Sequence, residues 1–140
     1  MKYDVCIYHA NCADGFTAAW IASRAGVPDL VPFSYGDPLP VEDYEGKHVL
    51  IADFSFPAQT LRNLAQYARS VTVLDHHKSA AEQLSEFEWH DGAHDFKSAG
   101  TNIRAKFDMT KSGAMLACDH LFPGDPPRLV SYVQDRDLWK

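Results

Sequence analysis

The sequence of 140 residues has no hydrophobic run that approaches the roughly 20 apolar residues a membrane-spanning helix needs. Its first residues, Met1 to Val5, carry an acid where a signal peptide would place its apolar segment. It has only three cysteines, Cys6, Cys12 and Cys118, and their odd number and wide spacing do not suit a disulfide scaffold. We therefore expect a reduced, cytoplasmic protein without a membrane span.

Basic residues are also scarce. The 13 Lys and Arg residues stand against 19 Asp and Glu residues, which gives a net charge of −6. Proteins that bind long duplex nucleic acid rely on basic side chains to neutralise phosphates, so we do not expect that function. Small phosphorylated substrates remain open, because a bound divalent cation reverses the local charge. Neither repeats nor long linkers interrupt the chain, and its length suits one domain over residues 1–140.

Short apolar runs alternate with helical patterns along the chain. Strands are expected at 5–8, 31–35, 48–52, 71–74 and 102–107, and helices at 16–25, 57–68, 79–86, after Ser112 and after Pro126. Residues 11–15 are expected to form a loop. Strands that alternate with helices form parallel sheets covered on both faces, so the pattern predicts an α/β three-layer sandwich with a mostly parallel sheet of about five strands.

Three of the expected strands run into side chains that bind metals or move protons. In open α/β sheets the carboxyl ends of the strands form the ligand-binding edge, so these side chains should converge there. Single members have ordinary explanations, because Asp-Gly is a common turn pair and an acid before a helix is stabilised by the helix dipole. A triplet that ends an apolar strand is harder to explain. The full set of side chains that follow the three strands consists of His9, Asp14, Asp53, Asp75, His76 and His77.

Carboxylates and imidazoles without a Cys-x-x-Cys pair suit a borderline ion such as Mn²⁺ better than structural zinc. Several carboxylates in one pocket would repel one another unless cations neutralised them. Two ions roughly 3.5–4 Å apart could share one carboxylate, activate a water and hold a phosphoryl oxygen. We therefore expect two Mn²⁺ ions, with Mg²⁺ or Co²⁺ as substitutes, and hydrolysis of a phosphoester.

In motif order, His9, Asp14-Gly15, Asp53 and the triplet Asp75-His76-His77 resemble the DHH phosphoesterase superfamily, and the resemblance extends from Tyr8 to Trp139. This superfamily contains single-strand exonucleases, oligoribonucleases, cyclic-dinucleotide phosphodiesterases and family II inorganic pyrophosphatases. The chain is similar to the members of the oligoribonuclease and exonuclease type. The resemblance implies hydrolysis of phosphodiester or related bonds in small nucleotides or short single-stranded oligonucleotides, with pyrophosphate left open.

The same resemblance implies a division of roles within the site. Asp53 would bridge both metals and take part in catalysis together with His77, which would contact the substrate phosphate. The family also has a fourth motif with an acid near the end of the catalytic domain. Asp135 would be that acid, with Asp137 as the second choice. The remaining metal ligands would be His9, Asp14, Asp75, His76 and Asp135.

Two features depart from the family pattern. The first motif commonly has two aspartates separated by one residue, and Cys12 takes the earlier position. A thiolate at Cys12 could bind a metal, whereas a neutral thiol would weaken that site, and the sequence leaves both interpretations open. Family members also usually add a C-terminal substrate-binding lobe, which we do not expect here. The chain is then either a fragment of a longer protein or a minimal domain.

Further substrate contacts are expected from residues that bind phosphate through charge or backbone N–H groups. Lys111-Ser112-Gly113 stands at a helix start, which attracts anions, although an ordinary helix cap explains it equally well. Lys78 and Arg136 are additional candidates. Four other histidines are expected to be surface or structural residues: His48, His90, His94 and His120.

Two other functions fit parts of the pattern. The first is a catalytically impaired domain that binds a metal or a nucleotide, with Cys12 marking the lost activity. The second is a phospho-receiver signalling domain with Asp53 as the phosphorylated residue. A receiver has an acidic pair after its first strand, however, where this sequence has His9. The exact substrate and the oligomeric state are not indicated by the sequence.

Overall fold

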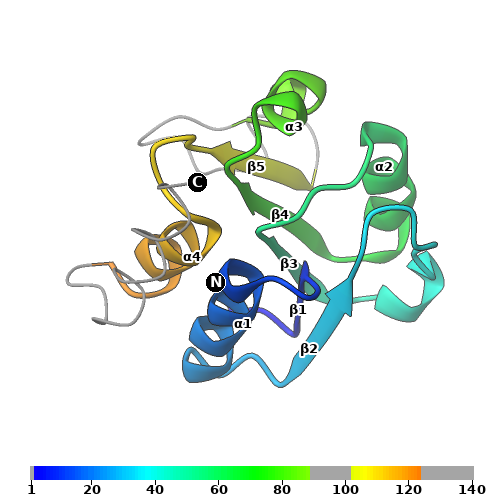
Figure 1. The fold of residues 1–140 in the computed structure, drawn as a ribbon. Helices are drawn as coiled ribbons and strands as arrows, with labels where there is room; N and C mark the ends of the chain where they lie inside the picture. Colours follow the sequence, from blue (N-terminus) through cyan, green and yellow to red (C-terminus); the bar gives the residue numbers. More distant parts are fainter. Residues whose placement is uncertain (1, 89–101, 124–140) are drawn as a thin grey trace.

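A computed structural model of the chain, which describes residues 2–88 and 102–123, contains a five-stranded parallel sheet between layers of helices (Figure 1). The strands follow the order β2-β1-β3-β4-β5, and every neighbouring pair is parallel. Their bounds are Val5–His9 (β1), Asp29–Phe33 (β2), His48–Ala52 (β3), Ser70–Asp75 (β4) and Ile103–Phe107 (β5). The expected α/β three-layer sandwich is confirmed.

The helices lie on both faces of this sheet. Helices α1 (Ala13–Arg24) and α4 (Gly113–Leu121) pack against each other on one face (Figure 1). Helix α2 (Ala58–Tyr67) covers the other face, together with the segment that follows α3 (Lys78–Gln83). Two short 3₁₀ helices, Val41–Tyr44 and Ser85–Phe87, complete the elements of the described residues. None of the helices in the described ranges is long and apolar enough to cross a membrane.

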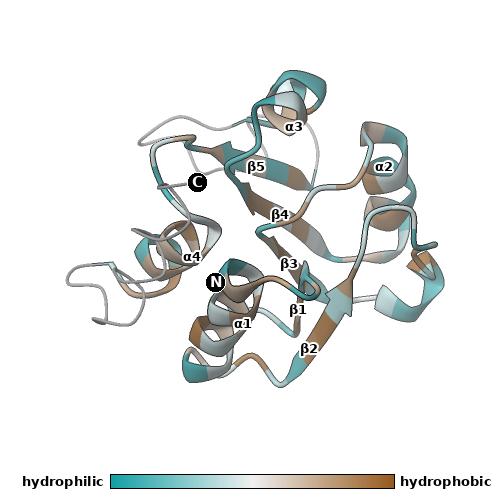
Figure 2. Cartoon of the chain, viewed as in Figure 1, coloured by the Kyte–Doolittle hydropathy of each residue, from teal (hydrophilic) through white to brown (hydrophobic). Residues whose placement is uncertain are grey.

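Each central strand contributes to two hydrophobic cores, because successive side chains of a strand point to opposite faces. In β3, Val49 and Ile51 pack under α2, whereas Leu50 and Ala52 pack under α1 and α4. The apolar colour of the central strands in Figure 2 reflects this burial on both faces. The continuous apolar runs of the sequence are explained by these two cores.

Two of the element boundaries that differ from the expectation affect the candidate site. Helix α1 begins at Ala13, so Asp14 and Gly15 lie in its first turn and not in a loop. This turn runs so close to β1 that a Cβ atom on Gly15 would lie 2.2 Å from the carbonyl oxygen of His9. Strand β2 ends at Phe33, so Tyr35 lies in the following turn. The helix expected after residue 126 falls outside the described residues.

Candidate metal-binding site

The carboxyl ends of β1, β3 and β4 lie next to one another at one edge of the sheet, and the expected site residues meet there. They form two overlapping groups of potential metal ligands, each with donor atoms within 4.8 Å of one another. Asp53 is common to both groups. The first consists of His9, Cys12 and Asp53, and the second of Asp53, Asp75, His76 and His77.

Asp53 is buried, with a relative exposure of 1%, at the point where the chain leaves β3. Its backbone has a φ of 57°, a left-handed conformation that few residues other than glycine adopt, although aspartate does so more readily than most. One carboxylate oxygen is 2.9 Å from Nε2 of His76, and the other accepts a hydrogen bond from Sγ of Cys12 at 3.5 Å. Burial and the charge of Asp14 raise the pKa of Asp53 to about 7, although the hydrogen bond with His76 opposes this shift.

Asp14 joins the site to the start of a second helix. Its two carboxylate oxygens accept hydrogen bonds from the backbone N–H groups of Gly113 and Ala114, both at 2.8 Å. Oδ2 also lies 3.3 Å from Nε2 of His76. Burial alone would raise the pKa of Asp14, but the hydrogen bonds from His76 and from the two backbone groups outweigh it and lower the pKa. Asp14 is therefore a charged carboxylate beside Asp53.

Gly113 brings α4 against the site. A Cβ atom at this position would lie 2.5 Å from Cβ of Asp53 and 2.7 Å from its Oδ1. Both distances are shorter than non-bonded atoms allow, so only glycine fits between the helix and the carboxylate. The start of α4 therefore packs directly against Asp53, the acid that both ligand groups share.

His76 lies between the two carboxylates. Burial would lower its pKa, but its contacts with Asp14 and Asp53 prevail and raise the pKa to about 10. Without a metal, the protonated imidazole supplies a positive charge between two acids. A divalent cation that binds here would have to displace that proton, which links metal binding to pH.

Asp75 holds His77 in position. It is completely buried, and its oxygens accept hydrogen bonds from Oγ of Ser55 and from the backbone N–H of His76, each at 2.8 Å. The same carboxylate is 2.7 Å from Nδ1 of His77. A carboxylate oxygen accepts this hydrogen bond, so Nδ1 is the donor. Nε2 takes no part in it, and the side chain of His77 is 40% exposed. This contact raises the pKa of His77.

Cys12 precedes the first residue of α1 and lies partly buried beside His9 and Asp53. Burial, together with the negative charges of Asp53 and Asp14, raises the pKa of its thiol. The thiol is therefore neutral in the metal-free protein and donates to Asp53. A bound cation would favour the thiolate, because it reverses the charge that the sulfur faces.

The start of α4 already uses its backbone donors within the protein. Gly113 and Ala114 donate to Asp14, and Met115 donates to the buried side chain of Ser112 at 3.1 Å. The helix-cap explanation therefore accounts for Ser112 and Gly113. Nζ of Lys111, which precedes α4, lies 2.6 Å from a carboxylate oxygen of Asp119 within that helix.

The other expected contacts differ in their setting. Lys78 is exposed at the first residue of α3. His48 lies 2.6 Å from the hydroxyl of Ser70, which agrees with a structural role. Five expected residues fall outside the described part of the chain: His90, His94, Asp135, Arg136 and Asp137.

Two features beside the site were missed in the sequence. Ser55 gave no signal, because its contact with Asp75 depends on the packing of two strand ends. Tyr35 lies against the site through an aromatic contact, with its ring 5.4 Å from that of His9. Burial and the charges of Asp75 and Asp53 raise the pKa of Tyr35 to about 12. Its only signal was its position at the end of an expected strand and before a glycine.

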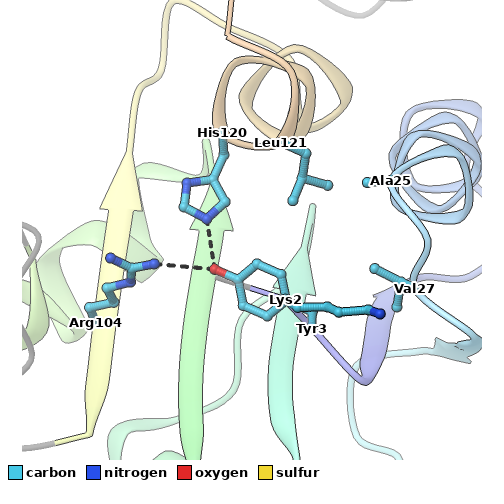
Figure 3. Close-up of a pocket in the computed structure, with 7 residues that line it drawn as sticks. All are labelled: Lys2, Tyr3, Ala25, Val27, Arg104, His120 and Leu121. Atoms are coloured by element: carbon cyan, nitrogen blue, oxygen red, sulfur yellow. Dashed lines mark hydrogen bonds between the residues drawn. The ribbon is translucent and has the colours of Figure 1, made fainter.

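A cavity of about 220 Å³ lies at the opposite end of the sheet (Figure 3). At its centre, the hydroxyl of Tyr3 donates to Thr72 at 3.1 Å and accepts from Arg104 at 3.2 Å. The same hydroxyl is 2.7 Å from Nε2 of His120. These contacts join the N-terminal segment, β4, β5 and α4. The cavity is therefore separate from the cluster at the carboxyl ends of the strands.

Comparison with known proteins identifies one relative. The chain is 30% identical, over 158 residues, to an uncharacterized protein of Acanthamoeba polyphaga mimivirus. The alignment includes 99% of this chain and 34% of the viral protein, so the chain spans about a third of that relative's length. No protein-family model matches the sequence. No solved structure matches it either.

Proposed function

We propose that this chain is a metal-dependent phosphoesterase domain of the DHH type. Its substrates would be small nucleotides or short single-stranded oligonucleotides, and its cofactor would be a pair of Mn²⁺ ions. The observation that supports this proposal most strongly is the sharing of Asp53 between two groups of potential ligands. A carboxylate in that position suits the bridge between two cations.

The donor set fits two divalent cations. Asp53 is buried beside a second acid, Asp14, and a protonated His76 balances their charge only in part. Divalent cations would neutralise these carboxylates, activate a water and stabilise the charge that develops on a phosphoryl group. His9 and Cys12 would complete the ligands of one ion, and His76 and Asp14 those of the other.

Two residues would act on the substrate itself. Nε2 of His77, on a side chain that is 40% exposed, would contact a phosphoryl oxygen or donate a proton to a leaving group. Asp75 would be a positioning residue, because its carboxylate fixes Nδ1 of His77 as the donor. We assign Asp75 this positioning role in preference to a ligand role, because its contact with Nδ1 sets the orientation of the His77 imidazole.

The test is hydrolysis in the presence of Mn²⁺ by the wild type and by the Asp53→Ala variant. The substrates are short RNA, a cyclic dinucleotide, a nucleoside bisphosphate and pyrophosphate. We expect the variant to lose Mn²⁺-stimulated turnover and to remain folded by circular dichroism. Asp29→Ala, which removes an exposed acid at the far end of β2, is the matched control and should retain activity. Unchanged turnover in Asp53→Ala would contradict the proposal.

The neutral thiol of Cys12 favours a second candidate, a catalytically impaired domain that binds a metal or a nucleotide. Calorimetric Mn²⁺ binding by the wild type, without turnover of any of the four substrates, would identify it. For either function we propose a cytoplasmic location, which the three free cysteines support.

A further inference from the structure

Tyr35 is presented to solvent by a well-fixed turn. The backbone N–H of Asp37 donates to the carbonyl of Ser34 at 3.1 Å, and the side chain of Asp37 accepts from the N–H of Ser34 at 3.0 Å. Gly36 has a φ of 94°, which suits the third position of a type II turn. The turn therefore holds Tyr35 at its second position, and 58% of this residue remains exposed.

The ring of Tyr35 is also held from below. One face stacks on Phe54, with ring centres 4.5 Å apart and planes at 20°. Phe54 is itself buried and packs against Phe56 and Phe33, with ring centres at 5.0 Å and 6.5 Å. The need to cover Phe54 explains one face of the tyrosine. It leaves the 58% exposure of this residue without an explanation.

The position of this ring relates it to the candidate site. Phe54 follows Asp53 directly in the sequence, and the ring of His9 meets that of Tyr35 edge-on at 5.4 Å. The tyrosine thus borders the group of His9, Cys12 and Asp53. A nucleotide whose phosphate reached that group would bring its ribose and base to the neighbouring surface.

We propose that the exposed part of the Tyr35 ring is a stacking platform for a nucleobase, so that the substrates are nucleotides and not base-free phosphates such as pyrophosphate. This inference rests on the proposed phosphoesterase function and names its substrate class. Exposed aromatic rings bind bases by stacking with little dependence on sequence, because every base has a π face. Stacking would add to the binding of a nucleotide by a chain with a net charge of −6, which has few basic side chains to bind phosphates.

The test compares a dinucleotide with the same compound carrying an abasic ribose, in the presence of Mn²⁺. In Tyr35→Leu, which keeps an apolar cover over Phe54, kcat/KM for the dinucleotide should fall roughly 5- to 150-fold, the equivalent of one base–aromatic stack. The value for the abasic compound should not change. Tyr35→Phe and Tyr35→Trp should behave like the wild type. Tyr67→Leu is the control, because this half-exposed tyrosine ends α2 and lies away from the site.

The possible results separate this inference from the function on which it rests. Equal kcat/KM for both compounds in the wild type, or equal values in Tyr35→Leu and Tyr67→Leu, would overturn the platform and leave the phosphoesterase standing. Absence of all turnover in the wild type would remove the proposed function. Calorimetry with 5′-AMP and ribose 5-phosphate in Mn²⁺ then decides the platform. Tighter binding of 5′-AMP that is lost in Tyr35→Leu would support it, and equal binding of the two compounds would overturn it.

Discussion

His77 donates from Nδ1 to the buried carboxylate of Asp75 across 2.7 Å. Asp75 is in turn fixed by Oγ of Ser55 and by the backbone N–H of His76. The first residue of the triplet therefore controls the tautomer and the orientation of the third. The middle residue, His76, contacts Asp53 and Asp14 through its Nε2.

Asp75→Asn should damage catalysis and spare metal binding. The backbone N–H of His76 and Nδ1 of His77 both face Oδ1 of Asp75, so an asparagine keeps its oxygen there and its NH₂ group faces Ser55. The substitution removes the negative charge that favours a protonated His77, so we expect kcat to fall roughly 10²-fold, the lower end of the range for general acid–base catalysis. Calorimetry should give unchanged Mn²⁺ affinity, and NMR titration of the metal-free variant should show a lower pKa for His77. Ser55→Ala removes a different contact of Asp75 and should have a smaller effect on kcat. Loss of Mn²⁺ binding in Asp75→Asn would show that Asp75 is a ligand.

The metal-free protein should lose stability as the pH rises. Asp53 keeps its proton up to a pKa of about 7 in the folded protein against 3.8 ordinarily, and His76 keeps its own up to a pKa of about 10 against 6.5. In both windows the folded state binds more protons than the unfolded state, so the free energy of unfolding falls with increasing pH. The measurement is Tm in a chelating buffer from about pH 6 to about pH 9, within these windows.

Mn²⁺ should reverse this trend, because it competes with the protons on the same two residues. The increase in Tm that Mn²⁺ produces is therefore expected to grow as the pH rises. Asp53→Asn, which cannot titrate at this position, should lose both the Mn²⁺ effect and the lower part of the pH dependence. If the increase in Tm produced by Mn²⁺ stayed constant with pH, Asp53 and His76 would not be ligands of the metal.

Gly113→Ala should disturb both the fold and the site. Its new Cβ would lie 2.5 Å from that of Asp53, and relief of this overlap should cost about 1–3 kcal/mol of stability. Mn²⁺ affinity should fall as well, because the helix would push the shared carboxylate. Gly26→Ala is the control. The φ of 91° at this position makes alanine unfavourable, but the added Cβ would have no neighbouring atom within 4 Å. That variant should lose stability, by about 1–2 kcal/mol, and keep its metal affinity.

Cys12 should determine which ions the first ligand group prefers. Thiolate sulfur favours Zn²⁺ over Mn²⁺, so Cys12→Asp should raise the affinity for Mn²⁺ relative to Zn²⁺ in competition experiments. In the wild type loaded with Co²⁺, we expect a sulfur-to-cobalt charge-transfer band that Cys12→Ser lacks. Cys118→Ala, at a buried position in α4, should retain the band. A band that persisted in Cys12→Ser would exclude the thiol as a ligand.

The sequence predicted the sheet and the edge at which the candidate residues meet, because both follow from local patterns. Apolar runs located the strands, and the parallel topology then brought His9, Asp53 and Asp75 to the same edge. The predicted start of α1 was wrong, because the pair Asp14-Gly15 commonly forms turns and was therefore assigned to a loop. Its helical position depends on the close packing of Gly15 against β1.

The partners of the site residues could not be predicted, because they depend on contacts distant in sequence. Asp14 accepts from Gly113 and Ala114, which lie 99 and 100 positions away. Nothing near Asp14 in the sequence indicates that α4 would begin there. The aromatic contact of Tyr35 with Phe54 similarly depends on the turn after β2 folding over the end of β3.

The two hydrogen bonds from α4 to Asp14 make the helix a sensor of the site. An anion at a helix start stabilises the helix, and the effect weakens when the anion's charge is shared with another cation. A metal bound to Asp14 would therefore weaken the hydrogen bonds that the backbone N–H groups of Gly113 and Ala114 donate to this carboxylate. The chemical shifts and exchange rates of these two amides would then record the loading of a site that lies at the far end of the sequence.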